Sequence, residues 1–270
     1  MVEAWRFRPS TLDQAIFNGV VLWNEYDLPG HFTRDDILID IGSHIGSFAE
    51  AALSRGCENI FCIEADHSNV EIAEENLKPY IQKGFVKLIW GAAWRSDPNN
   101  DELYFDGYHP FPESYPGMEG ILNTGNGSVM WPSAGNGTPV TKFAFDEIVD
   151  SLTNHGENRI RLLKVDCEGA EWPILLTSRK LDLVDEICGE FHEIGGEFLE
   201  ISEDRISTQP VFSYEGSTKF TVDLLVSYLS SLGFTVTYRR HSRPSGDLEG
   251  LGLFFAKRLI RVPEPLPMTE

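Results

Sequence analysis

The sequence predicts an α/β protein with a doubly wound, mostly parallel sheet that is covered by helices on both faces. Residues 37–41 (ILIDI) form a nearly unbroken apolar run, which suits a strand that is buried on both sides. A glycine-bearing turn and a helical stretch follow, and residues 60–63 (IFCI) form a second apolar run. Strand, turn, helix and strand in this order are typical of a βαβ unit.

Gly42 and Gly46 bracket the turn after the first strand. Without a Cβ atom they allow a sharp turn and a close approach of the backbone to a ligand, and the helix expected at residues 47–55 points its N-terminal N–H groups at the same place. Gly56 is expected to end this helix. The second strand ends in Glu64, where a carboxylate can accept hydrogen bonds from two ribose hydroxyls. The unit therefore predicts a nucleoside site.

The spacing within the turn indicates which nucleoside binds. Asp40, Gly42 and Gly46 spell DxGxxxG, whereas the dinucleotide fingerprint is GxGxxG. A carboxylate just before the glycines would repel a diphosphate and would favour a cationic ligand, such as the ammonium or sulfonium end of S-adenosylmethionine. A plain strand, turn and helix with a capping Asp is the alternative, and Glu64 in register on the next strand favours the nucleoside site.

The chain carries 42 acidic residues against 22 basic ones, a net charge of −20. Because phosphate contacts need clustered Lys and Arg, this balance argues against a nucleic-acid partner and against an anionic membrane surface. No apolar run approaches the roughly 20 residues of a membrane span, and the opening residues MVEAWRFRPS contain no apolar core of a secretory signal. We therefore expect a cytoplasmic protein. Its cysteines, expected to be reduced core thiols because none forms a CxxC pair, are Cys57, Cys62, Cys167 and Cys188.

Residues 1–36 are expected to form a helical segment over the cofactor site. Thr11 can cap a helix, apolar residues recur at helical spacing over residues 15–23, and Pro29 with Gly30 ends the helix before the first strand. Candidate contacts to the amino-acid end of the cofactor, with surface roles as the alternative, are Arg8, Asp13 and Tyr26.

The next elements are a helix over residues 69–80, which should end near Pro79, and a third strand at residues 86–90. Small residues at 91–93 would let an adenine ring lie against the backbone, with simple close packing as the alternative. Residues 95–139 lose periodicity, and so long an irregular stretch usually carries function. We interpret it as a lid or acceptor-binding insertion, although aromatic packing could merely hold the loop down. Its candidate pocket residues are Tyr104, Tyr108, His109, Phe111, Tyr115, Met118 and Trp131.

The remaining chain completes the sheet. A helix at residues 143–152, a fourth strand at 161–165, a fifth within 183–191 and a helix at 222–232 precede two strands, 234–238 and 251–256. These make seven strands, with the final pair as antiparallel neighbours. The main domain is thus expected to span residues 37–260, and residues 261–270 form a tail that should fray.

The segment LLKVDCEGAEW at residues 162–172 carries a family resemblance. Together with DIGSHIG, EAD after the second strand, FDEI and EFHE, it resembles the FkbM family of S-adenosylmethionine-dependent methyltransferases over about residues 5–255. Ser43 and His44 depart from the more usual Ala and small polar residue of that family. The resemblance implies a Rossmann-like sheet in the order 3-2-1-4-5-7-6, with the last strand antiparallel, and methyl transfer that usually goes to a hydroxyl oxygen.

By position, the resemblance places Glu64 on the ribose, Asp66 and residues 91–93 beside adenine, and Asp166 at the methionine end. The full cofactor site that it implies is Asp40, Gly42, Ser43, His44, Gly46, Glu64, Ala65, Asp66, Ala92 and Asp166.

Methyl transfer to an alcohol needs a base, because an alcohol is a poor nucleophile at neutral pH. His192 is the first candidate, since its unperturbed pKa of about 6.5 suits that role, and Glu168 and Glu190 are the further catalytic candidates. Alternation along a strand places Glu190 and His192 on the same side. Glu190 or Glu193 could orient the ring. The alternative for Glu168 and Glu171 is that they open a helix, where acids are favoured regardless of catalysis.

The sequence therefore predicts an S-adenosylmethionine-dependent O-methyltransferase that acts on a hydroxyl of a small molecule or of a sugar or glycan. No metal site is predicted, although the same carboxylates with His192 could hold a divalent ion such as Mg²⁺ or Mn²⁺. The alternatives are an NAD-dependent oxidoreductase, which DxGxxxG opposes, and a non-catalytic binding protein that keeps the fold. The sequence does not set the oligomeric state.

Overall fold

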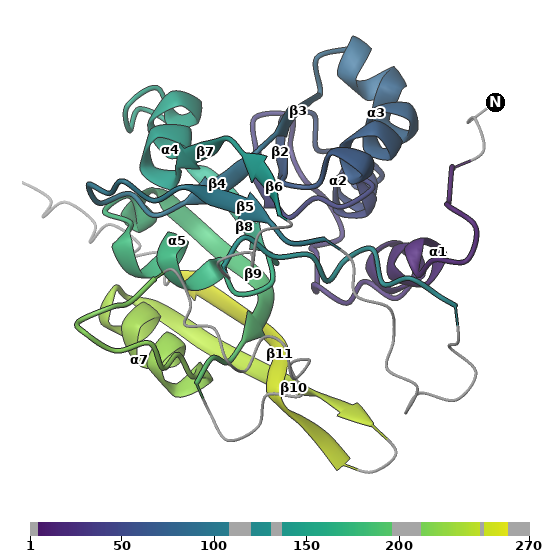
Figure 1. Ribbon diagram of the computed structural model, residues 1–270. Coiled ribbons are helices and arrows are strands. Elements are labelled where there is room, and N and C mark those ends of the chain that lie inside the picture. The colour runs from purple at the N-terminus through teal and green to yellow at the C-terminus, as the bar shows by residue number, and fades with distance from the viewer. Residues whose placement is uncertain (1–4, 108–119, 131–136, 196–211, 244–245, 259–270) are drawn as a thin grey trace, which may run out of the picture.

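The chain is built around one seven-stranded sheet in the order β10-β11-β9-β8-β1-β2-β3 (Figure 1). The computed structural model describes residues 5–107, 120–130, 137–195, 212–243 and 246–258. Strand β11 is antiparallel to both of its neighbours, and the other pairings among β9, β8, β1, β2 and β3 are parallel. The predicted fold, strand order and antiparallel last strand are confirmed. The strands are β1 (Ile37–Ile41), β2 (Ile60–Glu64), β3 (Val86–Trp90), β8 (Ile160–Val165), β9 (Val184–His192), β10 (Phe234–Arg243) and β11 (Gly246–Arg258).

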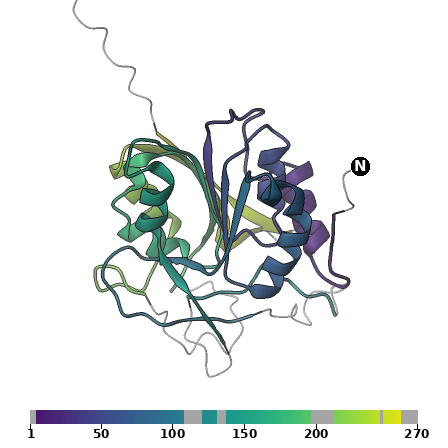
Figure 2. The ribbon, with the colours of Figure 1, turned by 90° about the horizontal axis from the view of Figure 1, so that it is seen from above.

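Helices cover both faces of this sheet (Figure 2). One face carries α1 (Asp13–Phe17), the π-helix η1 (Asn18–Leu22), α2 (Ser47–Leu53) and α3 (His67–Gln82). The other face carries α4 (Phe145–Thr153), α5 (Glu171–Thr177) and α7 (Val222–Ser231). A short 3₁₀ helix, η2 (Leu181–Leu183), leads into β9. In the part of the chain that the structure describes, no helix combines the length and the apolar character needed to cross a membrane.

The nearly unbroken apolar run at residues 37–41 is explained by the packing of β1, whose side chains enter a core on each face of the sheet. Ile39 and Ile41 belong to the core formed with α4, α5 and α7, whereas Leu38 belongs to the core formed with α2 and α3. Successive side chains of a strand point to opposite faces, so a central strand covered on both sides must be apolar at nearly every position. Asp40 is the exception, and it is fully buried.

The end of α3 and the form of the N-terminal helix differ from the prediction. Helix α3 runs through Pro79 to Gln82, so the predicted end near Pro79 is wrong. Leu77 is fully buried and Ile81 packs against the same core, and this packing outweighs the lost backbone N–H of one proline. At the N-terminus, the expected single helix is a short α-helix followed by η1, which ends at Leu22, ahead of Pro29.

The predicted insertion, residues 95–139, is partly described. On either side of this segment, β4 (Ala92–Trp94) pairs in parallel with β7 (Lys142–Ala144). Between these two strands in the sequence, β5 (Leu103–Phe105) pairs antiparallel with β6 (Thr138–Val140). Tyr104 lies exposed on β5. The other aromatic candidates of this segment, from Tyr108 to Trp131, lie outside the described residues. The lid role and the domain boundaries remain predictions.

Candidate functional site

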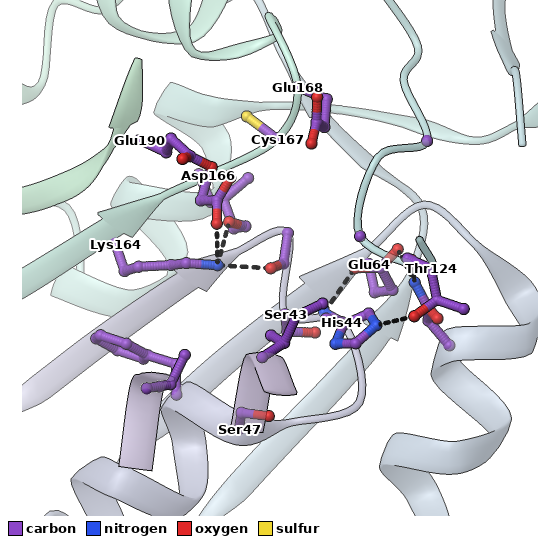
Figure 3. Close-up of a pocket in the computed structure, with 18 of the residues that line it drawn as sticks. Ser43, His44, Ser47, Glu64, Thr124, Lys164, Asp166, Cys167, Glu168 and Glu190 are labelled. Atoms are coloured by element: carbon purple, nitrogen blue, oxygen red, sulfur yellow. Dashed lines mark hydrogen bonds and ion pairs between the residues drawn. The ribbon is translucent and has the colours of Figure 1, made fainter. Parts of the chain in front are cut away.

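A cavity of about 370 Å³ lies at the carboxyl ends of β1, β2, β8 and β9, and Figure 3 shows its interior. Its walls come from the N-terminal segment, the turn after β1, the ends of the central strands and the described part of the insertion. Predicted site residues in its lining are Gly42, Ser43, His44, Glu64, Ala65, Ala92, Asp166, Glu168 and Glu190. The carboxyl edge of a doubly wound sheet is where such folds bind ligands.

The turn after β1 can be made only with glycine at position 42. Gly42 has φ +74°, and a Cβ atom there would lie 1.8 Å from the backbone oxygen of Asp166. The N–H groups of Gly42 and Ser43 donate to the Ile63 carbonyl at 3.0 and 3.2 Å, which ties the turn to the end of β2. The backbone is therefore in direct contact with both neighbouring strands and lies open to the cavity.

Glu64 is held rigidly at the tip of β2. Its Oε2 accepts a hydrogen bond from the His44 N–H at 2.8 Å, and its Oε1 accepts one from the Asp66 N–H at 2.9 Å. Burial raises the pKa of this carboxyl. Two backbone donors fix the group in place, so the carboxylate that the sequence predicted at the strand tip lines the cavity in one defined orientation.

Asp40 has a different partner from the one predicted. Its Oδ1 lies 3.2 Å from Nζ of Lys164, which faces it across β1 and β8. Lys164 also donates to the Gly42 carbonyl at 2.6 Å. Burial opposes the charge on Lys164, but Asp40 and Asp166 raise its pKa above the ordinary value. Asp40 thus pairs with a lysine that supports the turn, and its attraction of a cationic ligand stays a prediction.

Two other predicted residues also have structural roles. Asp66 caps α3, accepting from the Ser68 N–H at 2.9 Å. Gly46 has φ +93°, and a Cβ there would lie 2.6 Å from Leu77, so this glycine lets the turn pack against α3. Both lie next to the cavity, and direct contacts of Asp66 with adenine stay a prediction.

The N-terminal segment is fastened over the cofactor end of the cavity. Arg8 donates from Nε to Asp13 Oδ2 at 2.9 Å, and the Thr124 hydroxyl donates to Asp13 Oδ1 at 2.6 Å. The Thr124 oxygen lies 2.8 Å from Nε2 of His44 (Figure 3). Asp13 and Tyr26 are buried, so the alternative surface roles are wrong for both. Thr124 belongs to the predicted insertion, which thus reaches the turn after β1.

Three buried polar atoms of this end have no hydrogen-bond partner among the described residues. They are Oγ of Ser43, Nδ1 of His44 and Oγ of Ser47. All three side chains line the cavity. Buried polar groups are nearly always satisfied in folded proteins, so these atoms fit a polar ligand. The set of two hydroxyls, one carboxylate and exposed turn backbone suits a nucleoside that carries a polar tail.

The opposite end of the cavity is crowded with acids (Figure 3). Asp166 accepts a 2.6 Å hydrogen bond from the Tyr26 hydroxyl, and Glu190 is ion-paired with His241. Glu168 has φ +54°, precedes α5 rather than opening it, and lines the cavity. Burial raises the pKa of Glu168 to about 8. The helix-opening alternative therefore applies to Glu171, the first residue of α5, and not to Glu168.

His192 lies behind these acids in a charged environment. Its Nδ1 is 3.1 Å from Oε1 of Glu171, and its Nε2 is 3.3 Å from Oε2 of Glu168 and 3.7 Å from Oε2 of Glu190. Burial opposes its charge, but Glu168 and Glu171 raise its pKa well above 6.5. The surrounding acids thus shift the pKa of His192 away from the unperturbed value on which its choice as the base was argued.

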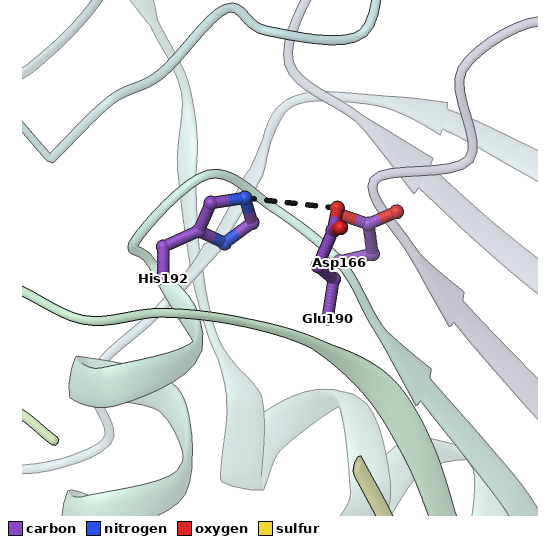
Figure 4. A group of neighbouring side chains, drawn as sticks. All are labelled: Asp166, Glu190 and His192. Carbon is purple, nitrogen blue, oxygen red and sulfur yellow. Dashed lines mark ion pairs between the residues drawn. The ribbon is translucent and has the colours of Figure 1, made fainter. Parts of the chain in front are cut away.

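Asp166, Glu190 and His192 form a group of possible metal ligands (Figure 4). Each offers one ligand atom, and the three atoms lie within 4.8 Å of one another.

Several residues of the site were missed from the sequence. Lys164 could have been found, because a lysine inside an otherwise apolar strand signals a buried partner. Ser47 opens the predicted helix and gave no separate signal. Glu25 and His241 line the acidic end but come from distant segments, and no local pattern indicates that the fold brings them together.

The fold is a Rossmann-like doubly wound sheet with a cavity at its carboxyl edge, and the family model places the chain among the methyltransferases of this class. Within it the chain belongs to the FkbM family, since the family model described as "Methyltransferase FkbM domain" matches residues 40–236. No curated protein matches the chain.

Solved structures of similar fold include an FkbM methyltransferase from Methylobacillus flagellatus, with 15% identity and a TM-score of 0.45 over 88% of this chain and 47% of that one. M. capricolum TrmK in complex with S-adenosylhomocysteine has 8% identity and a TM-score of 0.44 over 88% and 67% of the two chains. Precorrin-6y C5,15-methyltransferase from Geobacter metallireducens has 11% identity and a TM-score of 0.40 over 95% and 92%.

Proposed function

We propose that this protein is an S-adenosylmethionine-dependent methyltransferase that methylates a hydroxyl oxygen of a small molecule or of a sugar. The observation that carries the proposal is the Glu64 carboxylate, which two backbone N–H groups hold at the cavity wall beside the Gly42 turn. Membership of a methyltransferase family supports it. The four cysteines are free thiols, which persist in reducing compartments, and this supports a cytoplasmic location.

The cofactor end has a residue for each part of this ligand. Glu64 accepts hydrogen bonds from the ribose hydroxyls, and the small residues Gly91 and Ala92 leave room for adenine against the backbone. The orphaned hydroxyls of Ser43 and Ser47 lie on the side of the turn where the amino-acid end would reach. S-adenosylmethionine, when bound, supplies a methyl group already activated by its sulfonium sulfur.

The acidic end suits an acceptor that must lose a proton. Glu168 lines the cavity, and its Oε2 lies 3.3 Å from Nε2 of His192. We assign Glu168 as the group that accepts the hydroxyl proton, because its carboxyl group lines the cavity, whereas Asp166 accepts from the Tyr26 hydroxyl and Glu190 is paired with His241. Glu190 and His192 are the other two proposed catalytic residues, because their side chains set the electrostatic environment of Glu168. General-base catalysis of this kind contributes about 10²–10⁴ in rate.

Calorimetric titration with S-adenosylhomocysteine tests the cofactor site. The wild-type protein should bind it, and NAD⁺ in the same titration should not bind. Glu64→Ala should weaken binding about a hundredfold, because two hydrogen bonds to a charged group are lost. Glu71→Gln is the matched control, since this exposed acid lies on α3 outside the cavity. Unchanged affinity of Glu64→Ala, or preference for NAD⁺, would refute the proposal.

A further inference from the structure

We propose that Asp166, Glu190 and His192 bind one divalent metal ion at the acceptor end of the cavity. The inference rests on the proposed function for its catalytic meaning, but the site itself stands on the placement of the three side chains. Asp166 directly follows β8, and Glu190 and His192 lie on the neighbouring parallel strand β9 (Figure 4).

The spacing of the three ligand atoms fits one ion after a small contraction. In an octahedral site with bonds of about 2.1 Å, neighbouring ligand atoms lie about 3 Å apart and opposite ones about 4.2 Å apart. Here all three atoms lie within 4.8 Å of one another, and Nε2 of His192 is 3.7 Å from Oε2 of Glu190. Rotamer adjustments of two half-buried acids cover the difference.

The histidine ring is already oriented as a metal ligand. Oε1 of the fully buried Glu171 lies 3.1 Å from Nδ1 and also accepts the His192 backbone N–H at 2.8 Å. Its Oε2 is held by the Gly169 N–H at 2.9 Å. A carboxylate on one ring nitrogen that directs the other nitrogen at the ion is the usual support of a metal-bound histidine. Glu171 therefore positions the His192 ring, a role beyond that of an acid in the first turn of α5.

Asp166 and Glu190 are also oriented by residues outside the three proposed ligands. Oδ2 of Asp166 accepts from the Tyr26 hydroxyl, and Oε1 of Glu190 is paired with His241. Each acid thus has one oxygen fixed by a neighbour and a second oxygen to offer. Hydrogen bonds to ligating carboxylates are a regular feature of metal sites.

Charge favours a cation at this place. The acidic groups gathered here outnumber the basic ones: Glu25, Asp166, Glu168, Glu171 and Glu190 against Lys164, His192 and His241. An ion bound to Nε2 of His192 would add positive charge to this acidic group. One imidazole with two carboxylates suits Mn²⁺ or a similar transition ion better than Mg²⁺, which prefers oxygen ligands alone.

The position gives the ion a role in the proposed reaction. It would lie beside Glu168, at the end of the cavity away from Glu64. A cation there would bind the acceptor oxygen and make its hydroxyl more acidic, and the proton would pass to the Glu168 carboxylate. Acceptors with two adjacent oxygens, which can bind one ion together, should then be preferred.

Electron paramagnetic resonance of Mn²⁺ titrated into the full chain tests the site without reference to turnover. We expect one bound ion per chain. Glu190→Gln and Asp166→Asn should each weaken binding at least tenfold, and Glu171→Gln should weaken it about tenfold or more, as expected for loss of an orienting partner. Glu186→Gln is the matched control, because this acid lies on the same strand but pairs with Arg161 and Lys257 on the protein surface. It should bind Mn²⁺ as the wild type does.

Titration of the wild type, Glu190→Gln and Glu171→Gln with S-adenosylhomocysteine separates the two proposals and shows that these two variants are folded. Circular dichroism checks the fold of Asp166→Asn, because Asp166 is itself a predicted cofactor residue. If the wild type binds S-adenosylhomocysteine but takes up no Mn²⁺ at about 1 mM, the weak end of protein affinities for such ions, the metal site is refuted and the proposed function stands. Equal Mn²⁺ affinity in wild type and Glu190→Gln would also refute it. If S-adenosylhomocysteine fails to bind the wild type, the proposed function falls.

Discussion

Glu64 and Glu168 are two carboxylates in one cavity, and their surroundings differ. Glu64 ends β2, and two backbone N–H groups hold its oxygens. Glu168 follows β8, and its Oε2 lies 3.3 Å from Nε2 of the His192 ring. Glu64 is buried and Glu168 is half-buried, and burial raises the pKa of each. What separates them is the kind of group that each one faces.

This difference divides the cavity into two halves. The half around Glu64 binds the cofactor, and the half around Glu168 exchanges protons or cations. Backbone donors cannot move or change charge, so the Glu64 half is a fixed template. The titratable side chains around Glu168 can move and can change charge, so the charge of this half depends on the ligand that it binds. Lys164 connects the two halves, because its Nζ contacts Asp40 and the Gly42 carbonyl and lies 4.0 Å from Asp166.

The largest expected effect is therefore that of Lys164→Met. It leaves Asp40 as a fully buried acid without its countercharge and removes the donor that supports the turn. We expect a loss of about 3–5 kcal/mol in the free energy of unfolding, the usual cost of breaking a buried ion pair. Urea denaturation measures it.

Arg161→Met is the control for this change. Arg161 lies on the same strand but pairs with Glu186 near the surface, so its loss should cost at most about 1 kcal/mol. Equal costs for the two variants would mean that the two halves are not joined through Lys164.

The fixed half was the part that the sequence predicted best. The apolar run at residues 37–41, Gly42 and Glu64 act locally, within one βαβ unit, and the strand order followed from the resemblance. The partner of Asp40 was missed because Lys164 is 124 positions away in the sequence. In the other half, Glu168, Glu190 and His192 were predicted from the sequence, whereas Glu25 and His241 were missed. The raised pKa of His192 was missed too, because it depends on acids from β9, from α5 and from the loop between β8 and α5. Pro79 shows the same limit for local rules, because packing of Leu77 decides where α3 ends.

The turn itself can be tested by Gly42→Ala. A Cβ there would lie 1.8 Å from the Asp166 carbonyl, so the end of β8 must shift. We expect a cost of about 3 kcal/mol in stability, from backbone strain together with overpacking, and weaker binding of S-adenosylhomocysteine. Gly84→Ala separates the two contributions, because Gly84 has φ +77° with nothing within 4 Å of the added Cβ. It should cost about 1 kcal/mol, and a similar cost for both variants would show that the turn yields without strain.

The smallest effect, and the one that depends on pH, concerns the segment fastened over the fixed half. Burial opposes the charge on Asp13, but hydrogen bonds from His44, Arg8 and Thr124 hold its pKa well below the ordinary value. A lowered pKa in the folded state stabilises the fold above the unfolded pKa, about 3.9, and this contribution is lost as the pH falls below it, by about 1.4 kcal/mol per pH unit. Asp13→Asn should therefore cost about 2 kcal/mol at pH 7, and the gap to the wild type should shrink between about pH 4 and pH 3. Urea denaturation across this pH range measures the difference in the free energy of unfolding between the wild type and Asp13→Asn. Asp35→Asn, at an exposed position, is the control and should unfold with the same free energy as the wild type. A gap that stays constant with pH would mean that the Asp13 charge does not hold this segment over the cavity, and that the fixed half is closed by packing alone.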